Sequence, residues 1–460
     1  MSKEDHADHH IRAYPPGDLI ADGVVTELQA EMLFNDYARR LDHYLYRILG
    51  ASATLDGIRA SSPALLAAVC TVAALHSEDL AALYEPCYRC FAAMAANLAL
   101  AENANMDDIR SLCIGAFWLH RLSWNLSALA VRIATQKHLH RAFRAAVAKK
   151  DSFHFAQTRL YFLVYVCDHH FSIAYGRPPL TQDSEDIIRA RDFLLLPAAT
   201  EDDARLVSQV ELWCITSRVL GAFGFDVEVS LSPSLLSLMR RFAIDYDTWR
   251  ADWNDRFGRH VRVGNYPRKG VKLHVNFAKL YLCSHAFRGL APGLRPAFRD
   301  ESPGDGPPSG LLRTGSVHTH TSPMQECRVA AATDEANDGI LDSADLGDMA
   351  LTAVQAAQDI LDTMVSDAEI QEHIHGLPVY FHTMIAFATI FLFKVATKYA
   401  HVVKIDVARA LALLVDVSRI LKTMTATMAT HHLLERVQRK LRPLWILETV
   451  LLRRDDYRLG

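Results

Sequence analysis

Histidine and cysteine side chains are the groups in this chain that could most readily bind a metal ion. Residues two apart on a helix point to different faces, so a close pair within a helix is poorly placed to share one ion. The pattern therefore favours structural or solvated histidines over metal ligands. The close pairs among the 22 histidines are His138-x-His140, His169–His170, His318-x-His320 and His373-x-His375.

Cys87-Tyr-Arg-Cys90 is the one CxxC pattern in the sequence. A zinc site would need a second such pair, and the next cysteine, Cys113, stands alone in apolar sequence. A redox pair would need a βαβ setting, and no strand pattern is present. The eight cysteines lie mostly in apolar helical segments, which predicts reduced core thiols and a reducing compartment.

Catalytic signatures are missing from the sequence. It contains no GxSxG, GxGxxG, GxxxxGK or HExxH pattern. We therefore expect no catalytic residues, no metal ligands and no enzymatic activity. An unrecognised helical enzyme is the least favoured function class.

The charge of the chain gives no general attraction to nucleic acid or to acidic membranes, because the net charge is −4. Basic clusters at 141–150 and 436–442 could touch phosphates or act as import signals, but exposed helix faces explain them more simply.

Residues 1–23 are polar, which predicts a disordered lead-in without a secretory signal. We expect no membrane association.

Residues 106–180 form the stretch around which the other helices are expected to pack. Asn105 can cap one helix, and a second begins near Trp124. A third, from about residue 157, is apolar on nearly every side and stops at Gly176–Arg177–Pro178–Pro179. A helix that is apolar all round is typically central.

The helical pattern of the whole chain predicts an all-α fold, namely a large multi-helix bundle with a long disordered insertion. Residues 24–290 form its main domain, 291–344 a flexible insertion rich in Pro, Gly and Ser, and 345–460 helices that pack on the same bundle. The apolar run 377–393 is shorter than the roughly 20 residues of a spanning helix, which favours a buried helix. Helices are expected near 26–48, 61–75, 78–101, 203–223, 233–257, 271–289, 346–366, 377–400, 405–429 and 431–452.

Three blocks in the right order resemble the middle homology region of fungal zinc-cluster (Zn2Cys6) transcription factors. They are SSPALLAAVCTVAAL (61–75), IRSLCIGAFWLHRLSWNLSALAVRIATQKHLHRAF (109–143) and RLYFLVYVCDHHFSIAYGRPP (159–179). Details around Ser123–Trp124 and residues 130–134 are most similar to the regulators grouped with the activator of secreted proteases.

The resemblance implies a nuclear, all-α regulatory domain, with shuttling to the cytoplasm left open. It also leaves open a homodimer and a small-molecule effector or transcriptional co-regulator. In the family, six cysteines holding two zinc ions read promoter DNA from a separate N-terminal cluster. The first cysteine here is Cys70, inside the helical region, so we expect no cofactor and no DNA-binding residues in this chain.

Arg132, Asp168, Gly176, Arg177 and Pro178 carry the family signature and are expected to be structural. The helix capped by Asn105 and the helix that begins near Trp124 form a helical hairpin. An Asp–Arg or Arg–carbonyl bond between helices would position this hairpin against the central helix. A ligand-anchoring role stays open, because buried charge can also fix a polar metabolite. We interpret the chain as a ligand- or partner-responsive regulatory domain; the alternative is a helical interaction scaffold or metabolite sensor without DNA binding.

Overall fold

Helices form all the regular structure that the computed structural model describes, which covers residues 17–224, 233–259, 264–288, 343–400 and 403–425. No strand occurs in these ranges, and the all-α prediction is confirmed. Most of the predicted lead-in, residues 291–342 of the predicted insertion and the predicted helix 431–452 lie outside the described residues.

The N-terminal helices begin where the sequence provides caps. Thr26 forms a capping box with Gln29 at the start of α1, and Ser62 caps α3. The single helix expected over 26–48 is wrong, because a π-helical turn and a 3-10 turn follow α1. In order, the elements are α1 (Glu27–Asp36), η1 (Tyr37–Leu41), η2 (Asp42–Leu45), α2 (Leu55–Ser61), α3 (Pro63–Leu75), η3 (Ala81–Leu83) and α4 (Tyr84–Leu98).

The expected hairpin and central helix are present. Asn105 caps the first helix with a capping box to Asp108, and Asp151 caps the central helix, which therefore starts five residues earlier than predicted. Gly176 ends that helix in the left-handed region. The elements are α5 (Met106–Trp118), α6 (Ser123–Gln136), η4 (Leu139–Arg141), α7 (Ala142–Lys149) and α8 (Ser152–Tyr175).

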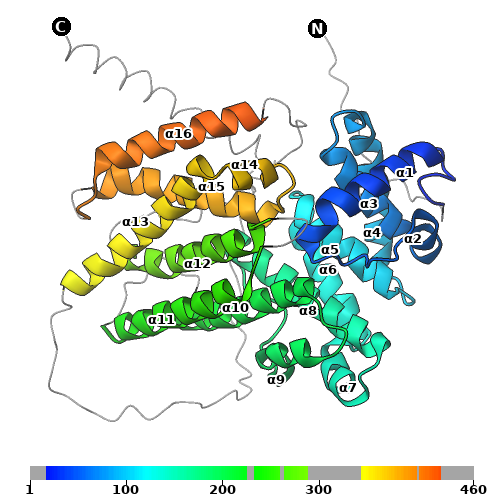
Figure 1. Cartoon of the computed structure of the whole chain (residues 1–460), viewed down its shortest axis with the longest axis horizontal. Helices are drawn as coiled ribbons and strands as arrows, with labels where there is room; N and C mark the ends of the chain where they lie inside the picture. Colours follow the sequence, from blue (N-terminus) through cyan, green and yellow to red (C-terminus); the bar gives the residue numbers. More distant parts are fainter. Residues whose placement is uncertain (1–16, 225–232, 260–263, 289–342, 401–402, 426–460) are drawn as a thin grey trace, which may run out of the picture.

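Helix α8 joins the two parts of the molecule. It packs against α5, α6 and α7 on one side and against α10 and α15 on the other, as Figure 1 shows. Helices α11 and α12 pack on α10, and α12 packs in turn against both α11 and α13, which contacts α15 and α16. The helices that follow α8 have these bounds. They are α9 (Glu185–Ile188), η5 (Ala190–Leu195), α10 (Glu201–Phe223), α11 (Pro233–Arg256), α12 (Tyr266–Ser284), η6 (His285–Phe287), α13 (Ser343–Ser366), α14 (Ala368–His373), α15 (Val379–Lys394), η7 (Val395–Tyr399) and α16 (Val407–Thr425).

One helical segment in the described ranges, Val379–Tyr399, is long and apolar enough to cross a membrane. In its most apolar stretch of 18 residues, 78% is buried inside the protein. Within it, Nε2 of His382 donates to the carbonyl oxygen of Ile374 at 3.1 Å. The segment packs against α8 and α13, as a core helix of the bundle does.

Candidate functional site

Asp168 lies on α8 and is buried, with 1% of its surface exposed. Its Oδ2 accepts hydrogen bonds from the backbone N–H groups of Leu180 and Thr181, at 2.8 and 2.7 Å, and from the Thr181 hydroxyl at 2.7 Å. These three bonds all end on Oδ2 and fix the loop after α8 against the central helix.

Gly176, Arg177 and Pro178 lie at the exposed end of α8. Gly176 has φ 60°, and the N–H of Arg177 donates to the carbonyl oxygen of Ser172 at 2.9 Å. The guanidinium of Arg177 lies 4.9 Å from the ring centroid of Trp124, at the start of α6. Arg177 therefore connects the central helix to the hairpin through an aromatic ring.

Arg132 is exposed on α6. Its guanidinium donates to the carbonyl oxygens of Leu98 and Ala99, at 3.1 and 2.7 Å. These carbonyls are at the C-terminal end of α4, where a cation satisfies otherwise unpaired acceptors and the helix dipole favours positive charge. Arg132 thus forms an Arg–carbonyl contact, but its partner is α4 and not the central helix α8.

The structure does not bring the predicted residues together into one site. Asp168 is buried and bonded to its own loop, whereas Arg177 stacks on aromatic rings and Arg132 binds α4. No Asp–Arg pair forms among these three residues. Of the two kinds of bond expected, the Asp–Arg bond does not form here, because backbone and hydroxyl donors of the loop bind Oδ2 of Asp168. The Arg–carbonyl bond does form, at Arg132.

A second polar centre, absent from the sequence-based predictions, surrounds residues 42–47, called the strained turn below. Tyr46 and Arg47 have φ of 56° and 55°, which costs a non-glycine residue roughly 1–2 kcal/mol. The guanidinium of Arg159, on α8, donates to both of their carbonyl oxygens and pairs with the carboxylate of Asp203. This contact ties the strained turn to the central helix.

A buried arginine of α10, Arg205, reaches the same turn. Its guanidinium donates to the carbonyl oxygen of His43 at 3.0 Å and to the carboxylate of Asp202 at 3.1 Å. It also lies 5.7 Å from the ring centroid of Tyr46 and 5.8 Å from that of Tyr266. Buried charge is stable only when it is paired in this way, so the strained turn is held from two helices.

Asp42 is the buried acid of the strained turn and forms no ion pair within the described residues. It is 3% exposed, and its carboxylate accepts a long hydrogen bond from the N–H of Leu49 at 3.4 Å. Burial raises the pKa of Asp42 from 3.8 to about 7, while that hydrogen bond and the charges of Arg159 and Arg47 act in the opposite direction. A carboxyl group of this kind titrates near neutral pH.

The described residues contain no group of three or more His, Cys, Asp or Glu side chains that could hold a metal ion. Cys87 and Cys90 are buried in α4, as predicted for core thiols. Burial raises the pKa of the Cys87 thiol to about 12, which makes it a poor nucleophile. His169 is buried as well, and its Nε2 lies 2.8 Å from the Ser217 hydroxyl.

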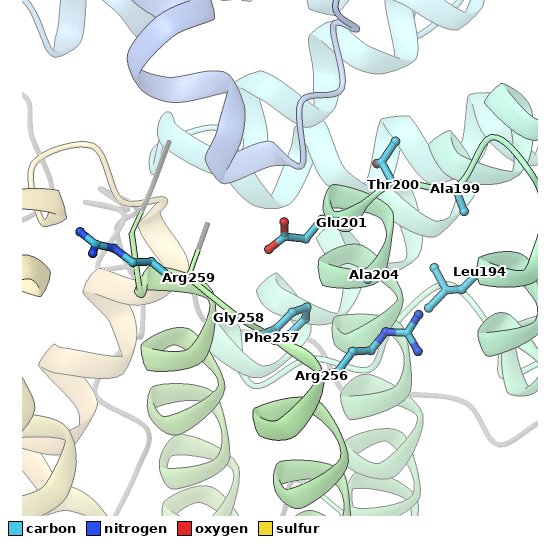
Figure 2. Close-up of a pocket in the computed structure, with 9 residues that line it drawn as sticks. All are labelled: Leu194, Ala199, Thr200, Glu201, Ala204, Arg256, Phe257, Gly258 and Arg259. Carbon is cyan, nitrogen blue, oxygen red and sulfur yellow. The ribbon is translucent and has the colours of Figure 1, made fainter. Parts of the chain in front are cut away.

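Among the surface cavities, one of about 410 Å³ lies between the start of α10 and the end of α11 (Figure 2). Ala204 and Phe257 are the buried residues of its lining. Figure 2 shows Arg259 directed away from Glu201, and Arg256 turned toward Leu194. The charged groups do not converge on this space, so it has little to fix a ligand.

A larger cavity of about 630 Å³, called the N-terminal cleft below, joins parts of the chain that are far apart in sequence. It lies between α1 with η1, the turn that follows α3, and the end of α14. Its size is that of a small-molecule site. It is lined by Met32, Leu33, Asn35, Asp36, Arg39, Arg40, Leu75, His76, Ser77, Glu78, Asp79, Leu80, Glu372 and His375.

Sequence reasoning missed both the strained turn and the N-terminal cleft. The segment containing Arg39, Arg40, Asp42 and Arg47 carries an unusual density of charge for a helix that must pack on a core, and that density is a usable signal. The partners Arg159 and Arg205, by contrast, are more than 100 residues away in sequence. Nothing local could identify them.

Comparison with known proteins gives one informative similarity. The chain is 32% identical over 390 residues to the "Transcriptional activator of proteases prtT" of Emericella nidulans. The matched region covers 83% of this chain and 52% of that protein, so the chain spans about half the length of this relative. No family model matches the chain. No solved structure matches it either.

Proposed function

We propose that this chain is the regulatory region of a fungal zinc-cluster transcription factor that controls transcription by RNA polymerase II in the nucleus. The observation that carries the proposal is the similarity to a transcriptional activator over 390 residues. Fold alone would not support it, because helical bundles serve many functions. A similarity spread over most of a chain is stronger support than any short motif.

In this proposal, promoter DNA is read by a zinc cluster outside these 460 residues. Cys70, the first cysteine of the sequence, is buried in α3, and the net charge of −4 does not favour DNA. A gel-shift assay with the 460-residue chain and protease promoter fragments tests this assignment. We expect no sequence-specific complex, and a specific complex at physiological salt would contradict it.

The helical region would regulate by changing the balance between two conformations. An effector or partner can shift that balance only if it binds the two conformations unequally. The strained turn is a suitable element, because Arg159 and Arg205 stabilise a backbone that is unfavourable without them. Homodimerisation and a co-regulator remain compatible with this scheme.

Deletion of the gene in its fungal host tests the regulatory role. The relative activates proteases according to its name, so we propose that transcripts of secreted protease genes fall on deletion and recover when the intact gene is restored. Transcripts of a constitutive housekeeping gene provide the control. Unchanged protease transcripts, under growth conditions that normally induce them, would contradict the proposal and favour the scaffold alternative.

A further inference from the structure

The N-terminal cleft has walls of opposite charge. Arg39 and Arg40 line it from the π-helical turn η1, and Glu78 and Asp79 line it from the turn after α3. Glu372, on α14, adds a third carboxylate. A cavity with a basic side and an acidic side suits a ligand that carries both charges.

Some of these charges are already neutralised. Arg40 forms a two-point ion pair with Asp36, at 3.2 and 3.0 Å. Arg39 uses only its Nε, which donates to the carbonyl oxygen of Asn35 at 3.3 Å. Within the described residues, the three carboxylates named above form no hydrogen bond or ion pair. The groups left for a ligand are therefore one guanidinium and three carboxylates.

Two histidines of the cleft do not change this balance. Burial lowers the pKa of His76 to about 4 and also lowers the pKa of His375. The Nδ1 of His76 lies 2.8 Å from the carbonyl oxygen of Val72. Both imidazoles are accordingly neutral at physiological pH, so the cleft keeps separate acidic and basic sides.

The cleft also has an apolar surface. Met32 is 48% exposed, Leu80 is half-buried, and Leu33 and Leu75 are buried behind them. Uncovered methionine and leucine side chains in a cavity favour an aliphatic group in the ligand. The volume of about 630 Å³ is sufficient for an amino acid or a very short peptide.

We propose that the N-terminal cleft binds a small zwitterion, namely an aliphatic amino acid or a short aliphatic peptide. Its carboxylate pairs with Arg39, its ammonium group lies among Glu78, Asp79 and Glu372, and its side chain contacts Met32. This inference rests on the proposed function, since it supplies the effector of the regulatory region.

The position of the cleft explains how such a ligand would act on the bundle. Arg39 belongs to η1, and η1 leads directly into the strained turn. On the other side of the cleft, the Tyr44 hydroxyl of that turn lies 2.7 Å from Nδ1 of His373, the last residue of α14. A ligand that bridges Arg39 and Glu372 therefore stabilises the arrangement of η1 and α14 around the strained turn.

Calorimetric titration and thermal unfolding of the purified 460-residue chain test the binding directly. The probes are leucine and the dipeptide alanyl-leucine, compared with N-acetylleucine, which has no ammonium group, and leucinamide, which has no carboxylate. We expect the two zwitterions to bind and to raise Tm. Each blocked analogue should bind at least about tenfold more weakly than leucine. Equal binding of a blocked analogue, or no effect of either zwitterion at millimolar concentration, would overturn the proposal.

Variants locate the binding in the cleft. Arg39→Gln and Glu372→Gln are surface changes and should leave the ligand-free Tm nearly unchanged, while weakening zwitterion binding about tenfold. Arg141 is an exposed arginine at the end of η4, immediately before α7. Arg141→Gln is the matched control and should bind as the wild type does. Unchanged affinity in both cleft variants would place the ligand elsewhere and overturn the assignment.

The two proposals fail in different ways. If no zwitterion binds but protease transcripts still depend on the gene, the regulatory function stands and the cleft assignment falls. If the zwitterion binds but deletion leaves those transcripts unchanged, the cleft is a binding site and the transcriptional role falls.

Discussion

Asp168 and Thr181 are joined by two hydrogen bonds to one carboxylate oxygen. Oδ2 of Asp168 accepts from the N–H and from the hydroxyl of Thr181, each at 2.7 Å, and the N–H of Leu180 adds a third bond. The loop that follows the Gly176 stop is thereby held on the central helix, in a place from which water is excluded.

Replacement of Asp168 by Ala should destabilise the fold by about 2–4 kcal/mol, because it leaves buried donors without an acceptor. Thr181→Val removes only the hydroxyl and should cost about 1 kcal/mol. Urea unfolding of both variants measures the difference. If Asp168→Ala keeps its stability and loses gene activation, the residue has a sensing role in place of a structural one.

Asp42→Asn should stabilise the protein, and more so as the pH rises. The pKa of Asp42 is raised to about 7 in the fold from 3.8, so the folded state retains a proton that the unfolded chain has lost. The contribution of Asp42 to the free energy of unfolding is therefore most favourable below pH 3.8. It declines as the pH rises from 3.8 to about 7 and is constant above that range. Each unit of this pKa difference corresponds to about 1.4 kcal/mol.

The measurement is the free energy of unfolding at pH 5 and pH 8 for the wild type, Asp42→Asn and the control Asp56→Asn, an exposed aspartate of α2. The gain from Asp42→Asn should be larger at pH 8 by up to about 3 kcal/mol, reduced by water penetration. A gain independent of pH would mean that Asp42 is ionised throughout this range.

Much of the fold could be predicted from local sequence, because helix boundaries depend on nearby residues. Thr26, Asn105 and Gly176 each determine a helix end through their own side chain or backbone freedom. Apolar residues at helical spacing in the segment after Thr26 are also buried, as that spacing indicates; they are Leu33, Tyr37, Leu41, Tyr44 and Ile48.

The conformation of that same segment could not be predicted, because distant residues determine it. Periodicity favours a continuous helix, whereas Arg159 and Arg205 bind the carbonyl oxygens of His43, Tyr46 and Arg47 and stabilise the strained turn instead. The partner of Arg177 was unpredictable for a similar reason. Its contact is the ring of Trp124, about fifty residues earlier, and spacing along one helix says nothing about it.

Gly176→Ala and Arg177→Ala separate two contributions to the end of α8. An alanine at φ 60° should cost about 1–2 kcal/mol because its Cβ approaches the backbone. Arg177→Ala removes an exposed contact with Trp124 and should cost about 0.5–1 kcal/mol. Thermal unfolding ranks the two, and a larger loss for Arg177→Ala would show that the ring contact, more than the glycine, holds the hairpin on α8.

Two helical glycines should respond in opposite directions to alanine. A Cβ on Gly115 of α5 would lie 2.5 Å from a ring carbon of Phe91 and 2.8 Å from a methyl of Leu126, so Gly115→Ala forces α4 or α6 away and should cost about 1–3 kcal/mol. A Cβ on Gly221 of α10 meets nothing within 4 Å. Gly221→Ala should therefore stabilise the protein by about 0.5–1 kcal/mol through helix propensity alone.

Urea midpoints of the two alanine variants measure both effects against the same wild type. A stabilising Gly115→Ala would mean that the ring of Phe91 has room to move, and that α4, α5 and α6 are less closely packed than these distances indicate. Because α5 also packs against α8, such slack would extend to the central helix, and the loop held by Asp168 should then be the first region to show faster amide exchange.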